Sequence, residues 1–192
     1  MNILNKIKFF LTKPNVVIVI GSERNLVKEL IVRLLKQHFH LGKEIFVVEN
    51  KALEKISFYL KHSPQPILVL TSFDSKFSIK NLPSYVWFIL NNDDEKIKEN
   101  MDNFKNFKSI KFGLSEENQL FVSDVKINSQ TNFKVNYLGS IVPFWLNGRL
   151  TENQIRDVLA VIGVGLALGL NLVEISQSFS HPSLKDLFIL IK

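Results

Sequence analysis

The sequence has no cysteine, few histidines and no dense block of basic residues. Without cysteine, the chain can form neither disulfide bonds nor thiolate metal sites. The four histidines do not have the spacing of metal ligands, so we interpret them as exposed or hydrogen-bonded residues. The net charge is +6, but the lysines are spread along the chain, which predicts a solvated surface and no nucleic-acid partner.

The sequence also lacks a recognisable targeting or membrane-spanning segment. Met1 to Thr12 contains Lys6 and Lys8 but only a short apolar cluster, which does not fit a cleavable signal peptide. The uncharged stretch from Val158 to Val173 is shorter than the roughly 20 residues that a transmembrane helix needs. We therefore expect a cytoplasmic protein without a membrane span, in which this stretch forms a buried helix.

The 192 residues and 16 phenylalanines are enough for one α/β domain with a large core. Its central feature is the stretch from Pro14 to His38. Val16 to Ile20 is an unbroken β-branched run, typical of a strand buried on both faces, and Gly21-Ser22 ends it. From Leu26 onward, apolar residues recur at helical spacing. In α/β proteins, such a strand, turn and helix often bind a nucleotide phosphate at the start of the helix.

Other segments show similar patterns along the rest of the chain. We predict buried strands at 44–48, 67–70 and 86–90, and helices at 52–60 and 95–104. Apolar and polar residues then alternate at 109–112, 120–127, 133–137 and 140–146, which predicts antiparallel strands. We predict helices at 151–170, with Thr151 as N-cap, and at 172–179, and a last strand at 187–191.

These elements predict a single α/β domain, residues 1–192, with a mostly parallel sheet flanked by helices and a small antiparallel subsheet. We divide it into an N-terminal helix (1–13), a parallel α/β part (14–108), antiparallel strands (109–147), and C-terminal helices with a last strand (148–192).

The turn after the first strand lacks the groups that a phosphate loop uses. A loop of the pattern G-x-x-x-x-G-K-[ST] needs a second glycine, a lysine on the phosphates and a hydroxyl on Mg²⁺. The nine residues from Gly21 to Glu29 place none of these correctly. Arg24 has no adjacent glycine, and Lys28 lies a full turn into the helix, so neither replaces the loop lysine. We therefore predict that nucleotide binding is weak or absent.

Several motifs, taken in chain order, resemble the Mur ligases, the ATP-dependent enzymes that build peptidoglycan precursors. Gly21-Ser22 and Lys28-Glu29 are similar to the ends of that family's Gly-Ser-x-Gly-Lys-Thr-Thr-Thr-Lys-Glu loop, one residue short. Residues 66–71 (Pro-Ile-Leu-Val-Leu-Thr) and 89–94 (Ile-Leu-Asn-Asn-Asp-Asp) resemble its "kPdiaviTn" and "vlNaDD" motifs. Lys111-Phe112-Gly113-Leu114, Phe133-Lys134-Val135, Gly148-Arg149, Leu159-Ala160-Val161 and residues 165–170 resemble later motifs, most closely in the ligases that add D-alanyl-D-alanine.

The resemblance implies the fold of the central ATPase domain of these ligases, which is P-loop NTPase-like, without their flanking domains. It implies Mg-ATP as cofactor, with Gly21, Ser22 and Lys28 at the phosphates and Asn91 near the adenine. It also implies a nucleotide-binding role for Asp93 and Asp94 in the same loop as Asn91, and it implies Glu49 as a Mg²⁺ ligand. No catalytic residue is assigned, because the family's loop lysine and threonines, and the histidines expected after Thr71 and Gly148, are missing.

These losses predict a Mur-ligase-like domain related to peptidoglycan biosynthesis that is catalytically degenerate. Three alternatives remain open: an ATP-binding ligase component completed by a partner chain, such as another Mur-ligase-like chain; a non-catalytic interaction or scaffold domain that contacts cell-wall synthesis proteins; and an unrelated α/β domain.

Overall fold

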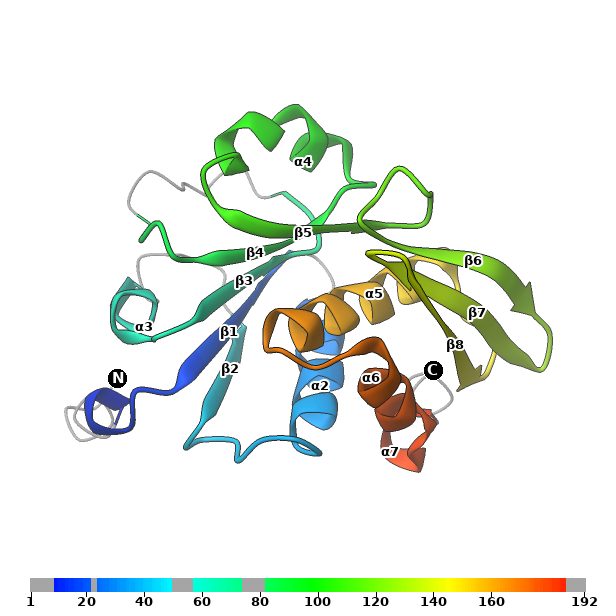
Figure 1. The fold of residues 1–192 in the computed structure, drawn as a ribbon, viewed down its shortest axis with the longest axis horizontal. Helices are drawn as coiled ribbons and strands as arrows, with labels where there is room; N and C mark the ends of the chain where they lie inside the picture. The colour runs from blue at the N-terminus through cyan, green and yellow to red at the C-terminus, as the bar shows by residue number, and fades with distance from the viewer. Residues whose placement is uncertain (1–8, 22–23, 50–56, 74–81, 186–192) are drawn as a thin grey trace.

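A single eight-stranded sheet organises the chain, in the strand order β2-β1-β3-β4-β5-β6-β7-β8 (Figure 1). The computed structural model describes residues 9–21, 24–49, 57–73 and 82–185. The strands are β1 (Asn15–Ile20), β2 (Ile45–Glu49), β3 (Pro66–Leu70), β4 (Trp87–Asn91), β5 (Lys108–Gly113), β6 (Leu120–Ile127), β7 (Gln130–Tyr137) and β8 (Ser140–Asn147). The helices are α2 (Arg24–Leu35), α3 (Ser57–His62), α4 (Glu95–Glu99), the 3₁₀ helix η2 (Met101–Phe104), α5 (Glu152–Ala167), α6 (Leu172–Ser180) and α7 (Pro182–Lys185).

The first four strands form the parallel sheet that the β-branched runs predict. β1 lies between β2 and β3, with Val17 opposite Val47 on one side and Ile67 on the other. Val16, Val17, Ile18 and Val19 are completely buried, as expected for a strand covered on both faces. The chain adds β2 on one side of β1 and then β3 and β4 on the other side. The carboxyl ends of β1 and β3 therefore lie side by side where the strand order reverses.

The prediction that residues 109–112 belong to the antiparallel strands is wrong. β5 pairs parallel with β4, from Trp87 opposite Lys108 to Asn91 opposite Phe112. Its side chains alternate between buried Ile110 and Phe112 and half-buried Ser109 and Lys111. Alternation therefore reports how each face is covered and says nothing about strand direction. The antiparallel subsheet consists of β6, β7 and β8, and it continues the same sheet because β6 pairs parallel with the end of β5.

Helices cover both faces of the parallel strands (Figure 1). On one face, residues of α2 and α5 share a core with alternate residues of the strands, among them Val17, Val69 and Ile89. On the other face, residues of α3, α4 and η2 pack with the remaining strand residues and with Phe9. Among the described residues, no helix is long and apolar enough to cross a membrane.

The long helix α5 begins as predicted. The Thr151 hydroxyl accepts a hydrogen bond from the Gln154 backbone N–H, and the Gln154 side chain accepts one from Thr151, which forms a capping box. The helix ends at Ala167, before the predicted residue 170, because Gly169 adopts a left-handed φ of 92°. Its buried face is confirmed, with Ile155, Leu159 and Ile162 at 0–2% exposure.

Three further predictions have partial outcomes. Residues 9–12 are helical, but residues 1–8 of the predicted N-terminal helix lie outside the described residues. The helix predicted at 52–60 is described only from Ser57, as α3, and the segment predicted as one helix at 95–104 divides into α4 and η2. The strand predicted at 187–191 lies outside the described residues, whereas the helix predicted at 172–179 is confirmed as α6.

Candidate functional site

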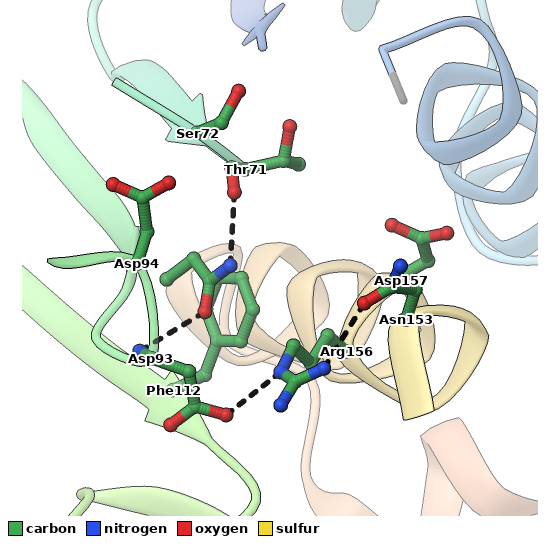
Figure 2. Close-up of a pocket in the computed structure, with 9 residues that line it drawn as sticks. Thr71, Ser72, Asp93, Asp94, Phe112, Asn153, Arg156 and Asp157 are labelled. Atoms are coloured by element: carbon green, nitrogen blue, oxygen red, sulfur yellow. Dashed lines mark hydrogen bonds and ion pairs between the residues drawn. The ribbon is translucent and has the colours of Figure 1, made fainter. Parts of the chain in front are cut away.

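A cavity of about 350 Å³ lies at the carboxyl ends of β3, β4 and β5, against the first turns of α5 (Figure 2). Parallel strands all end at this edge, so side chains from distant parts of the sequence meet there. The described residues that line the cavity are Thr71, Ser72, Asn91, Asp93, Asp94, Phe112, Asn153, Arg156 and Asp157.

Asn91 joins the loop after β3 to the loop after β4. Its Nδ2 donates a hydrogen bond to the Thr71 carbonyl oxygen at 2.9 Å, and its Oδ1 accepts one from the Asp93 backbone N–H at 3.2 Å. The Thr71 N–H donates in turn to the carbonyl oxygen of Ile20 at 3.0 Å, at the end of β1. These bonds join the ends of β1, β3 and β4, and they use both the nitrogen and the oxygen of the Asn91 amide.

Asp93 is the central acidic group of the cavity. Its Oδ2 accepts hydrogen bonds from Arg156 Nε at 2.8 Å and from the Leu114 backbone N–H at 2.9 Å. A side chain at Gly113 would collide with the Asp93 carboxylate and with the Asn118 amide. Glycine is therefore required at position 113, because a larger residue would not let the Asp93 carboxylate lie this close to the β5 backbone.

Arg156 extends from α5 across the cavity to Asp93 (Figure 2). Its Nη1 donates to Asn153 Oδ1 at 3.0 Å, and its Nη2 lies 3.5 Å from Glu152 Oε2. The Arg156 side chain is 23% exposed and that of Asp93 is 17% exposed. The ion pair thus joins α5 to the β4–α4 loop in a largely desolvated position, where it is screened less than a surface pair.

The sequence-based reasoning missed the contribution of α5 to this cavity. Asn153, Arg156 and Asp157 are three and four residues apart, so they share one face of a helix. They lie in the first two turns after the predicted cap Thr151, where polar residues interrupt an otherwise apolar helix. This spacing could have predicted a polar face on the helix. It could not have predicted that Arg156 on that face pairs with Asp93, which lies far away in the sequence.

The residues that the resemblance assigned to ATP or Mg²⁺ do not all meet. Asn91, Asp93 and Asp94 line the cavity, and Asp94 also caps α4 by accepting a hydrogen bond from the Ile97 N–H at 2.9 Å. Lys28 is half-buried on α2 and is not among the described lining residues.

Three further assignments concern the ends of β1 and β2. Gly21 has a φ of 134°, and a side chain there would collide with the Thr71 hydroxyl. Ser22 lies outside the described residues, as does the side chain of Glu49, the last residue of β2.

The described residues do not fit a magnesium-bound triphosphate. Three carboxylates, from Asp93, Asp94 and Asp157, line the cavity with one guanidinium, and that guanidinium already pairs with Asp93. Arg24, at the start of α2, donates from Nη1 to the Gly21 carbonyl oxygen at 3.1 Å and is not among the described lining residues. Within the described ranges, no group of three histidine or acidic residues is placed to hold a metal ion.

No protein-family model matches the sequence, and comparison with curated proteins gave no match. Solved structures of Mur ligases are similar in fold. MurF from Acinetobacter baumannii matches with a TM-score of 0.69 and 14% identity, over 91% of this chain and 47% of that one. MurF ligase from Thermotoga maritima, solved in complex with ADP, matches with a TM-score of 0.69 and 17% identity, over 90% of this chain and 50% of that one.

A third similar structure is UDP-N-acetylmuramate:L-alanyl-gamma-D-glutamyl-meso-diaminopimelate ligase from Neisseria meningitides. It has a TM-score of 0.68 and 13% identity, over 91% of this chain and 68% of that one. The chain therefore spans about half the length of the two MurF structures.

Proposed function

Because the chain has the fold of the Mur ligase central domain, as its motifs predicted, we propose that it is a Mur-ligase-like domain that does not itself catalyse ligation. In this proposal, the protein is cytoplasmic and acts beside the enzymes of peptidoglycan-precursor synthesis. It has the sheet and the Asn91 and Asp93 loop, whereas its sequence from Gly21 to Glu29 does not place the second glycine and the lysine of a phosphate loop.

The observation that carries this proposal is the ion pair between Arg156 and Asp93. Phosphoryl transfer depends on cations that hold the phosphates and neutralise their developing charge. Here Asp93 already neutralises the guanidinium that lines the cavity, and Asp94 and Asp157 add negative charge. A triphosphate would also lose the hydrogen bonds that a loop lysine and the backbone at a second glycine provide. Each hydrogen bond to a charged group is worth about 1.5–3 kcal/mol. Two such losses weaken binding by several orders of magnitude.

Isothermal titration of the purified chain with Mg-ATP at physiological salt tests this proposal. We expect no binding in the micromolar range and no ATP hydrolysis. MurF ligase from Thermotoga maritima is a suitable positive control, because its structure was solved in complex with ADP. Micromolar binding of Mg-ATP to the wild-type chain would overturn the proposal.

A second candidate function is that of a ligase component completed by a partner. It is favoured by the hydrogen-bonded frame of Thr71, Asn91 and Asp93, which lines the cavity at the carboxyl ends of the strands. The partner would be another Mur-ligase-like chain, whereas a scaffold role would require binding to a cell-wall synthesis protein.

Isolating the native complex under mild conditions separates these roles. If a partner completes the site, the complex should hydrolyse Mg-ATP, and the Asn91→Ala variant of this chain should reduce the rate. A complex whose ATP hydrolysis is absent, or is unchanged by Asn91→Ala, would rule out the completed-ligase role.

A further inference from the structure

A second cavity, of about 340 Å³, lies at the opposite edge of the parallel sheet from the Asp93 site. The described residues that line it are Phe10, Lys13, Lys61, His62, Ser63 and Pro64. They come from the segments that precede β1 and β3, which are adjacent strands. The Phe9 ring lies 5.8 Å from Phe58, so the N-terminal helical turn and α3 pack together there (Figure 1).

Ser63 is an unusual residue in the lining of this cavity, because its hydroxyl oxygen is buried without a partner in the described part of the chain. Ser63 is only 3% exposed, and its Oγ has no hydrogen-bond partner among the described residues. Its backbone N–H is already engaged, donating to the Tyr59 carbonyl oxygen at 2.9 Å. Buried hydroxyl groups are nearly always paired, because an unmet hydrogen bond is costly. A rotation of the Ser63 side chain toward the cavity would let a polar ligand there supply the missing partner.

The described lining of this cavity is basic, in contrast to the acidic Asp93 site. Lys13, Lys61 and His62 contribute amino and imidazole groups, and none of the described lining residues is acidic. The helix α3 ends at this cavity, and the carbonyl oxygens at the C-terminal end of a helix carry partial negative charge, which opposes an anion. The Tyr85 hydroxyl lies 3.3 Å from the carbonyl oxygen of Leu60 and 3.0 Å from that of Lys61, so it partly satisfies both.

Lys13 is held in an uncommon backbone conformation beside this cavity. Its φ is 43°, in the left-handed region that residues other than glycine and asparagine seldom adopt. Its N–H donates to the Phe9 carbonyl oxygen at 2.9 Å, which closes the N-terminal helical turn. Glycine would fit this position with less strain, and a lysine adds a charge at the cavity instead.

We propose that this cavity binds a phosphate group, carried either by a small molecule or by a lipid headgroup. The Ser63 side chain turns toward the cavity so that its O–H, which no described residue engages, donates a hydrogen bond to a phosphate oxygen, and the ammonium groups of Lys13 and Lys61 neutralise the charge. A lipid source is consistent with two neighbouring apolar side chains, Phe10 and Leu11, which are 54% and 77% exposed. This site does not depend on the proposed function of the Asp93 cavity.

Binding measurements on the full chain distinguish the two sources. Isothermal titration with inorganic phosphate tests a small-molecule site. Sedimentation with phosphatidylcholine vesicles, with and without phosphatidylglycerol, tests a lipid headgroup. Binding in either arm is expected to weaken about tenfold or more in Ser63→Ala and in Lys61→Gln, since each removes one charge-assisted hydrogen bond. Lys98→Gln makes the same charge change on exposed α4, at the other edge of the sheet, and should leave binding unchanged.

Thermal unfolding separates a ligand-binding serine from a structural one. Because the Ser63 hydroxyl has no partner in the fold, Ser63→Ala should leave the Tm unchanged or higher without phosphate. The same variant should lose the rise in Tm that the wild-type chain shows with phosphate or anionic vesicles. The proposal is overturned if the wild-type chain binds neither probe, or if Ser63→Ala and Lys61→Gln bind as the wild type does.

Discussion

Removing the Asp93 carboxylate should destabilise the fold measurably, and the size of the loss follows from the contacts of that group. Asp93→Ala leaves two donors without their acceptor, Arg156 Nε and the Leu114 backbone N–H, which lie 2.8 Å and 2.9 Å from Oδ2. The Arg156 guanidinium then remains in a site where its side chain is only 23% exposed. Asn153 still accepts one hydrogen bond from it, so the charge is not completely unpartnered.

The burial of the pair sets the magnitude. Breaking a fully buried ion pair costs about 3–5 kcal/mol, and an exposed pair is worth about 0.2–1 kcal/mol. Asp93 and Arg156 lie between these limits, at 17% and 23% side-chain exposure, so we expect Asp93→Ala to lower the free energy of unfolding by about 2–3 kcal/mol. Arg156→Met keeps an apolar stem of similar length, and should cost about 1–2 kcal/mol.

A double-mutant cycle measured by urea unfolding isolates the interaction. The two changes together should cost less than their sum, with a coupling energy of about 1–2 kcal/mol. The pair formed by Glu29 and Arg33 on α2 is a matched control, because its side chains are 47% and 30% exposed. Its coupling should be about 0.3–0.5 kcal/mol. If the coupling between Asp93 and Arg156 is no larger than that of the control pair, the ion pair does not bind α5 to the β4–α4 loop as we infer.

Two further predictions concern α5. Gly165→Leu should lower the free energy of unfolding, measured in urea, by about 1–3 kcal/mol. Even a Cβ atom at this position would lie 2.8 Å from Ile175 Cδ1 and 3.4 Å from Leu34 Cδ2. Unchanged stability would mean that α5 is less tightly packed than we infer. Thr151→Ala removes the capping box with Gln154 and should cost about 0.5–2 kcal/mol, whereas Thr151→Ser should retain most of that stability, and equal losses in the two variants would contradict the capping role.

Local pattern was sufficient for much of the fold. The β-branched run at Val16 to Ile20 predicted the buried central strand, and the polar residue before a long apolar helix predicted the Thr151 cap. Both signals depend on neighbours within a few residues, so they can be read directly from the chain. The motif at residues 89–94 also placed Asn91, Asp93 and Asp94 together, because Asn91 ends β4 and the two aspartates follow in the next loop.

By itself, the sequence determined the strands β1 to β8 and the helices α2, α5 and α6 to within a few residues, because periodicity and capping are local properties. The tertiary structure decided the direction of β5, since alternation at residues 109–112 records one-sided burial and not the direction of the neighbouring strand. It also decided that Arg156 meets Asp93, which lies 63 residues away in the chain, and that Ser63 and Lys13 line the same cavity. Such contacts depend on how the helices pack on the sheet, and no spacing within a single segment encodes that packing.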